Sequence, residues 1–212
     1  DYGLSYVSYF RPRSIKGADV DGDGKTDLMV TSYTDTVYIY RNTSERGNIS
    51  FANAIALSGF SAAEITIGDI DNDTRVDMVF SNYGGILVYQ NRSAGVGDLS
   101  NWVGTYYPSS INRNHSSPVI TDIDGDGLKD IGVLVSDSSK ALLFRNVGVG
   151  ANGRIVLGSP VQYAVGNKAT GLRFTDIDGD GRVDMMWMRQ YRNESFDSVM
   201  YCRNESRGIG DV

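Results

Sequence analysis

"DVDGDGKTD", at residues 19–27, is the stretch that decides the fold of this 212-residue chain. It places aspartates at its first, third, fifth and ninth positions, and carboxylates this close repel one another unless a cation lies between them. Near copies, "DIDNDTRVD", "DIDGDGLKD" and "DIDGDGRVD", start at residues 69, 122 and 176, so successive starts are 50, 53 and 54 residues apart. Such a period predicts stacked supersecondary units, each too small to bury a hydrophobic face alone.

Each loop lies between two short apolar runs, whose lengths and β-branched or aromatic content fit strands better than helices. The pairs are "SIKGA" and "LMVTS", "EITIG" and "MVFSN", "SPVIT" and "IGVLV", and "GLRFT" and "MMWMR". A third predicted strand ends each time in asparagine, as "VYIYRN", "ILVYQN", "ALLFRN" and "VMYCRN". We expect these asparagines, Asn42, Asn91, Asn146 and Asn204, to take left-handed turn geometry and to bond to nearby backbone.

A fourth strand is expected after a glycine-containing turn, begun by "GNISF", "GDLSNW" and "GRIVL" in the first three units and by "RGIGDV" in the last. Four short antiparallel strands about every 53 residues, without helical periodicity, predict an all-β fold, a β-propeller of four-stranded blades. Residues 1–212 would form a single propeller region, with units at about 1–51, 52–102, 103–157 and 158–212. The four repeats either close into a four-bladed ring or belong to a larger propeller or array, whose open sheet edges would favour association.

Composition narrows the class of protein. The 41% hydrophobic content supports a buried core, and neither a run of roughly 18 apolar residues nor a signal sequence is found, so we expect a soluble chain whose export signal has been removed. The formal charge is −6, but 16 of the 26 acidic residues are the loop aspartates, so the acidity reflects metal sites rather than an acidic surface. The sequence has no basic cluster, so it gives no support for nucleic-acid binding.

Calcium suits these loops because it takes six to eight oxygen ligands, and alternating aspartates on a tight turn can point several carboxylates inward. Glycine at position six of three loops permits the positive φ that wraps the chain around an ion. Position seven is chemically variable, as expected if it offers its backbone carbonyl; its residues are Lys25, Arg75, Leu128 and Arg182.

Other metals fit less well. Magnesium demands a tighter octahedron and keeps its waters, while zinc and copper favour His or Cys, of which the chain has only His115 and Cys202. An EF-hand would need glutamate at position twelve, where the loops have the strand residues Val30, Phe80, Val133 and Trp187.

With these motifs the units resemble FG-GAP or VCBS repeats, the blades of integrin-α-like propellers, over essentially the whole chain. The resemblance implies one structural calcium ion per loop, tying the hairpin. The ligands it implies are Asp19, Asp21, Asp23 and Asp27; Asp69, Asp71, Asp73 and Asp77; Asp122, Asp124, Asp126 and Asp130; and Asp176, Asp178, Asp180 and Asp184. The second loop has Asn72 and Thr74 where the others have glycines, so we expect it to bind calcium most weakly and Thr74→Gly to tighten it.

Seven Asn-X-Ser/Thr sequons, more than chance predicts, indicate a secreted or cell-surface glycoprotein. They are at Asn42, Asn48, Asn72, Asn91, Asn114, Asn193 and Asn204. The single cysteine, Cys202, allows no internal disulfide; we expect a buried strand residue, with an intermolecular bridge as the alternative.

Three classes of function compete. The favoured one is a non-enzymatic extracellular interaction or adhesion module that binds a protein or glycan partner, or associates with itself through blade edges. The alternative is a lectin-like propeller, for which the candidate stacking residues are Trp102, Trp187, Tyr106 and Tyr107. An enzyme is disfavoured because no nucleophile and base share a motif, and His115, in the Ser- and Asn-rich stretch "SINRNHSSP", is expected to be a solvent-exposed loop residue.

Overall fold

The computed structural model of this protein describes residues 11–58, 64–190 and 198–206. These residues form seventeen strands and no helix, so the predicted all-β class is confirmed. No described segment could therefore cross a membrane as a long apolar helix.

Four antiparallel sheets follow one another along the chain, one for each aspartate loop. The first sheet contains β1 (Pro12–Ala18), β2 (Asp27–Ser32), β3 (Thr36–Tyr40) and β4 (Ile55–Ser58). The second contains β5 (Ile65–Gly68), β6 (Asp77–Asn82), β7 (Gly85–Asn91) and β8 (Trp102–Pro108), and the third β9 (His115–Thr121), β10 (Asp130–Val135), β11 (Lys140–Phe144) and β14 (Val161–Ala164). The described part of the fourth contains β15 (Ala169–Thr175), β16 (Asp184–Arg189) and β17 (Ser198–Cys202). The predicted first three strands of every unit are therefore confirmed.

The fourth strands differ from the prediction. In the first and third units they are β4 and β14, which start several residues after "GNISF" and "GRIVL", whereas β8 starts at Trp102, the last residue of "GDLSNW". Instead, "GRIVL" supplies β13 (Ile155–Leu157), which pairs with β12 (Asn146–Val149) as a separate two-stranded ribbon, so there are five sheets rather than four blades. The ribbon forms because Ile155 is buried against the second sheet. The predicted strand in "RGIGDV" lies outside the described residues, and the unit boundaries remain a prediction.

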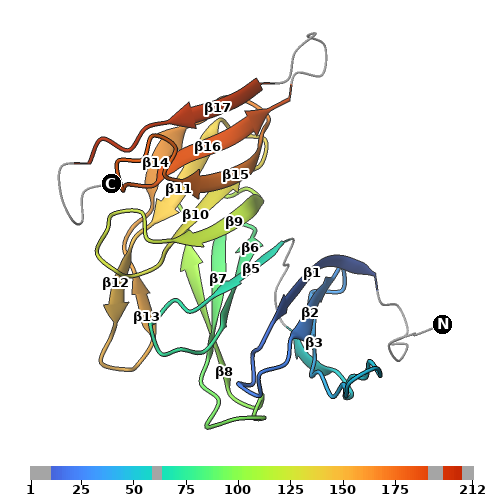
Figure 1. The fold of residues 1–212 in the computed structure, drawn as a ribbon. Helices are drawn as coiled ribbons and strands as arrows, with labels where there is room; N and C mark the ends of the chain where they lie inside the picture. The colour runs from blue at the N-terminus through green and yellow to red at the C-terminus, as the bar shows by residue number, and fades with distance from the viewer. Residues whose placement is uncertain (1–10, 59–63, 191–197, 207–212) are drawn as a thin grey trace.

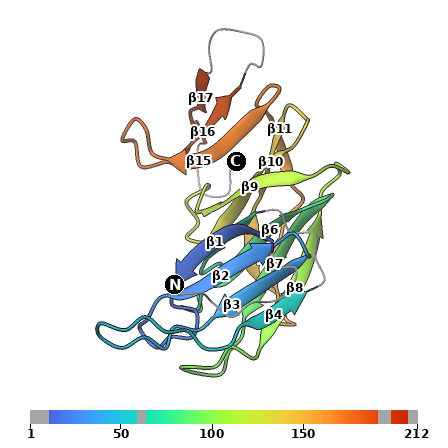
Figure 2. The ribbon, with the colours of Figure 1, turned by 90° about the vertical axis from the view of Figure 1, so that its right-hand side faces the viewer.

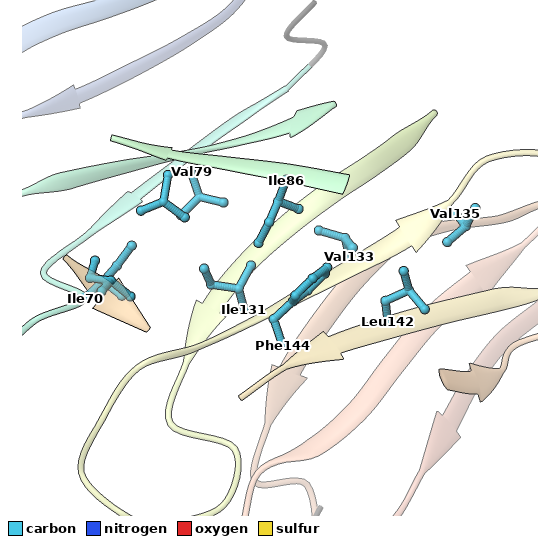
Figure 3. Close-up of a cluster of buried hydrophobic side chains, with 10 residues drawn as sticks. Ile70, Val79, Ile86, Ile131, Val133, Val135, Leu142 and Phe144 are labelled. Carbon is cyan, nitrogen blue, oxygen red and sulfur yellow. The ribbon is translucent and has the colours of Figure 1, made fainter. Parts of the chain in front are cut away.

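Apolar side chains fill the space between successive sheets. Figure 3 shows this for the second and third sheets, where Ile86 of β7 points toward Ile131 and Val133 of β10. Both faces of the central strands are used, because Met78 packs toward the first sheet while its neighbour Val79 packs toward the third. Each sheet is thus stabilised mainly by its neighbours.

The described sheets form an open arc. Their first strands lie side by side in chain order, β1 next to β5, β5 next to β9 and β9 next to β15. Figures 1 and 2 show the β15–β17 sheet at the top and the β1–β4 sheet in the lower half of both views. Three hydrophobic clusters join first to second, second to third and third to fourth sheets, and in the described parts of the chain none joins fourth to first. A closed four-bladed ring is therefore not formed by these residues.

Candidate metal centres

Each aspartate loop connects the first two strands of a sheet, and its position-one carboxylate shapes the turn. In the first loop the Asp19 carboxylate accepts hydrogen bonds from the backbone N–H groups of Gly22 (2.7 Å) and Gly24 (2.8 Å). Both glycines have positive φ, 75° and 85°, the left-handed conformation that brings their N–H groups inward. The third and fourth loops repeat this geometry with Asp122 and Asp176.

The position-nine aspartate starts the second strand of each sheet and is buried. In the first loop Asp27 accepts from the backbone N–H of Val20 (3.0 Å) through one oxygen and from that of Asn42 (2.7 Å) through the other. The corresponding residues of the other loops, Asp77, Asp130 and Asp184, make the same two bonds. This carboxylate therefore fastens the loop to the end of the third strand.

Three carboxylates converge in every loop, those of positions one, three and nine, with one oxygen of each within 4.8 Å of the others. The four sets are Asp19, Asp21 and Asp27; Asp69, Asp71 and Asp77; Asp122, Asp124 and Asp130; and Asp176, Asp178 and Asp184. In the second set Asp71 Oδ1 is buried and has no hydrogen-bond partner among the described residues, as expected of an oxygen that serves a cation. Hard carboxylate oxygens without nitrogen or sulfur ligands fit calcium or magnesium.

The position-five aspartates are not part of these sets but pair with arginines that sequence analysis missed. Arg41, at the end of the third strand, contacts Asp21 (2.5 Å) and Asp23 (3.4 Å). Arg145 and Arg203 make the same pairs with positions three and five of the third and fourth loops. The only sequence signal for these ion pairs was that an arginine precedes the closing asparagine in three units, in "YRN", "FRN" and "CRN".

The second loop replaces this arginine by Gln90, which donates to Asp71 (3.0 Å). Its position-five residue, Asp73, pairs instead with Arg75 of the same loop. At the backbone, Asn72 and Thr74 have φ of 58° and 73°, so the loop keeps the left-handed turns that glycine makes elsewhere. Positive φ is unfavourable for a β-branched residue, and Thr74 is therefore strained.

The closing asparagines are partly as predicted. In each turn the side-chain oxygen accepts from the backbone N–H two residues later, for example Asn91 from Ser93 (3.1 Å), which confirms local bonding. None has positive φ, so the left-handed prediction is wrong. Their amide groups have a further role, since Asn91 donates across the junction to the Val20 carbonyl (2.7 Å) of the preceding loop.

Burial sets the proton affinity of the position-nine carboxylates. The pKa is raised to about 7 for Asp77 and to about 6 for Asp130, mainly by desolvation; two backbone hydrogen bonds oppose the shift and the neighbouring aspartates add to it. Desolvation also raises the pKa of Asp27. A cation that binds these oxygens must therefore displace protons near neutral pH.

His115 and Cys202 correct two predictions. His115 is not a solvent-exposed loop residue: it starts β9, is 1% exposed, and its Nδ1 lies 2.9 Å from the Asn82 carbonyl oxygen. Burial lowers the pKa of this imidazole, because the charged form loses its hydration. Cys202 is exposed rather than buried.

The four aromatic candidates for sugar stacking do not form one platform. Trp187 is buried in the fourth sheet, with its Nε1–H donating to the Val165 carbonyl (2.8 Å), while the other three belong to β8 of the second sheet. There the polar groups of Trp102, Tyr106 and Tyr107 bind backbone carbonyls. The lectin-like alternative gains no support from these residues.

The sequons differ in accessibility. Asn91 is fully buried, and both amide hydrogens of Asn204 are used, by the carbonyls of Ile123 and Val183. The sequence predicted possible glycans at these two positions, and the fold does not allow them. Asn48, Asn72 and Asn114 are exposed and Asn42 is half-buried, so glycosylation there remains a prediction, and Asn193 lies outside the described residues.

Comparison with known protein families identifies the repeated unit. The model of the FG-GAP-like repeat matches three times, at residues 19–80, 69–133 and 122–187. The chain belongs to the FG-GAP-like repeat family. Each match starts at the first aspartate of one loop and ends in the second strand of the next sheet, and the family predicted from the sequence is confirmed.

Two curated relatives of this FG-GAP-like chain are integrin alpha chains. It is 27% identical to integrin alpha-4 of Xenopus laevis and 24% identical to integrin alpha-PS3 of Drosophila melanogaster, each over 168 residues. The alignments cover 68% of this chain but only 16% and 15% of the relatives, so the chain spans a small part of their length.

Proposed function

We propose that this FG-GAP-like chain is a non-enzymatic interaction module that calcium stabilises and that works outside the cell. The observation that carries the proposal is the set of four three-carboxylate clusters, each in a loop that backbone hydrogen bonds hold between the first two strands of a sheet. Three negative charges at such short distances favour a bound divalent cation.

The aspartates at positions one, three and nine would hold the ion directly. Position five, and the position-seven backbone carbonyls of Lys25, Arg75, Leu128 and Arg182, would complete the oxygen shell. When bound, calcium supplies the positive charge that offsets the repulsion between the carboxylates. The position-nine carboxylate transmits this effect to the fold, because it also fastens the loop to the end of the third strand.

An adhesion or interaction role is favoured by the similarity to integrin alpha chains. The exposed sequons at Asn48, Asn72 and Asn114 support an extracellular location, where calcium is abundant enough to fill such sites. The partner would be a protein or a glycan at the cell surface, or a second copy of this chain.

Catalysis has no candidate machinery in the described residues. The single histidine, His115, is buried, with its Nδ1 facing two backbone carbonyls and its Nε2 without a hydrogen-bond partner among the described residues. A general base needs a substrate within hydrogen-bond reach, and this imidazole has no access to one. Loop aspartates form ion pairs with arginines, Asp21 with Arg41 and Asp124 with Arg145.

The test is a calcium titration of the metal-free protein, followed by native mass spectrometry and thermal unfolding. We expect up to four calcium ions per chain and a rise in Tm that excess magnesium does not reproduce. An unchanged Tm in millimolar calcium would overturn the proposal. The position-nine variant Asp184→Asn should remove one ion, whereas the exposed Asp137→Asn, away from the loops, should remove none.

A further inference from the structure

The residue before the closing asparagine makes the same contacts in three of the four loops. It is an arginine whose Nε donates to Oδ2 of the position-three aspartate and whose Nη2 donates to Oδ2 of the position-five aspartate. The three sets are Arg41 with Asp21 and Asp23, Arg145 with Asp124 and Asp126, and Arg203 with Asp178 and Asp180. One guanidinium therefore joins two carboxylates that would otherwise repel each other.

The two oxygens of these carboxylates have different partners. In the first loop Asp21 Oδ1 accepts from the Asp23 N–H (3.1 Å) and Asp23 Oδ1 accepts from the Lys25 N–H (2.9 Å), both within the loop. The two Oδ2 atoms accept from Arg41 instead. The guanidinium thus takes one oxygen of each carboxylate and leaves the other to the loop and to an ion bound there.

Burial makes these ion pairs important to the loops. The side chains of Asp21 and Asp124 are 0% exposed, whereas those of Arg41 and Arg145 are 39% and 34% exposed. A buried carboxylate that stays charged needs an opposite charge or hydrogen bonds close to it. The partly exposed guanidinium supplies that charge, so the protein itself compensates the position-three aspartates of the first and third loops.

The second loop has no such arginine. Gln90 occupies its place and donates to Asp71 Oδ2 (3.0 Å), while Asp71 Oδ1 is buried without a hydrogen-bond partner among the described residues. The arginine of this loop, Arg75, contacts Asp73 instead. Of the four loops, this one therefore leaves the position-three charge to a bound cation.

The contacts of Gln90 with the third sheet explain why a glutamine is there. Its Oε1 accepts from the Ile155 N–H (3.1 Å) and its Nε2 donates to the Gly153 carbonyl (3.3 Å), so it joins the second loop to the β12–β13 ribbon. An arginine has only donors and could not make the first of these bonds. The ribbon therefore binds to the loop that has no counter-charge at position three.

We propose that Arg41, Arg145 and Arg203 are resident counter-ions, which share the position-three and position-five carboxylates with calcium and keep their loops in the binding conformation when calcium is absent. The second loop, with Gln90, depends on calcium for this conformation and is the first to lose it when calcium falls. The inference rests on the proposed calcium-stabilised module and adds a regulation of its sites. The same guanidinium charge opposes calcium, so each arginine lowers the affinity of its own site while it stabilises the metal-free loop.

The test is Arg145→Gln, because the third loop keeps its glycines and so excludes the strain of Thr74. The N–H of Gly127, which donates to Asp122 (2.9 Å), reports the loop conformation through hydrogen exchange. We expect its exchange to become faster in chelator and to return to the parent rate in saturating calcium. Tm should fall by about 2–4 °C in chelator and by less in calcium. Arg46→Gln, which removes an exposed arginine outside the loops, should change neither.

Calcium affinity distinguishes a counter-ion from a residue that only orients the carboxylates. Loss of the guanidinium charge should tighten calcium binding at the third site severalfold, measured by titration through the Gly127 amide resonance. A weaker third site would show that Arg145 only orients its aspartates, and equal falls of Tm in calcium and in chelator would show that it only stabilises the fold. Either result would overturn the proposal.

The first loop repeats the test, and the parent chain separates this inference from the proposed function. Arg41→Gln should speed the exchange of the Gly24 N–H, which donates to Asp19 (2.8 Å), again only in chelator. Unchanged exchange in both variants of a chain that still binds calcium would overturn the counter-ion role alone. A parent chain that binds no calcium in native mass spectrometry would overturn the calcium-stabilised module, and the counter-ion role with it.

Discussion

The second and third aspartate loops hold equivalent carboxylates in equivalent places, although their other residues differ. Each brings positions one, three and nine within 4.8 Å. The third loop turns on Gly125 and Gly127, with φ of 75° and 86°, while the second makes the same turns with Asn72 and Thr74. The carboxylate pattern therefore determines the loop conformation, and glycine only lowers its energetic cost.

Hydrogen bonds to the position-one aspartate explain why the second loop keeps its left-handed turns without glycine. Asp69 accepts from the Thr74 N–H (2.9 Å) as Asp122 does from that of Gly127 (2.9 Å). A residue held in an unfavourable backbone region costs about 1–3 kcal/mol. The loops differ also in charge, because Arg145 pairs with Asp124 in the third loop while neutral Gln90 contacts Asp71 in the second.

The largest expected difference between the two loops is in calcium-linked stability. Asp130→Asn should abolish binding at the third site and Asp77→Asn at the second, with the calcium-induced rise in Tm measured against chelator for each variant. A site at 100 times its Kd contributes about 2.7 kcal/mol, and one at ten times about 1.4 kcal/mol. If the second site binds more weakly, Asp130→Asn loses more of the rise. Equal losses over a range of calcium concentrations would contradict this ranking.

The next effect is that of backbone strain, which a reciprocal exchange isolates. Thr74→Gly should tighten calcium binding at the second site about tenfold, since removing about 1.4 kcal/mol of strain changes an equilibrium by that factor. Gly127→Thr should weaken the third site similarly, because a Cβ there meets no atom within 4 Å and adds only strain. Isothermal titration of both variants measures the change.

This exchange also shows when the strain arises. If the loop takes left-handed geometry only around the ion, the calcium affinity changes. If Thr74→Gly instead raises the unfolding free energy equally with and without calcium, the fold holds the strain and the ranking of sites has another cause.

The sequence was sufficient to predict the features that lie within one aspartate loop and its two flanking strands. The loop spacing and its flanking apolar runs predict β1–β2 and their equivalents, and three of the four aspartates of each loop converge, while their role as ligands stays a prediction. What the sequence did not show depends on contacts between residues far apart in the chain. The pairing of Arg41 with Asp21 joins residues 20 positions apart, and the bond from Asn91 to Val20 crosses between sheets.

The wrong predictions for His115 and Cys202 both concern burial. His115 is surrounded by polar residues in the sequence, yet it is buried because β9 lies between neighbouring sheets, beside β5 and β15. Cys202 lies in an apolar strand, yet it is exposed because it lines an open pocket between the third and fourth sheets, together with Leu143 and Met185. Burial in an array depends on the neighbouring sheets, which local pattern does not report.

The smallest expected difference between the loops is in pH dependence. Calcium must displace the position-nine proton, so affinity falls as pH falls through the pKa, about 7 for Asp77 and about 6 for Asp130. At pH 6 the first would be about nine-tenths protonated and the second about half, so the second site should weaken about tenfold and the third about twofold from their high-pH limits. Calcium titrations at pH 6 and 8, followed through the amide resonances of Thr74 and Gly127, report the two loops separately.

The sign for the calcium-free protein is the reverse. A carboxyl with its pKa raised from 3.8 to about 7 on folding binds more protons in the folded state, so its contribution to stability is present below pH 3.8 and is lost as pH rises toward 7. Without calcium, stability should therefore fall between pH 4 and 7, more for the parent chain than for Asp77→Asn, which cannot ionise. Parallel pH profiles of the two proteins in chelator would show that Asp77 is already ionised in the folded chain, and the steeper pH dependence expected of the second loop would then have no basis.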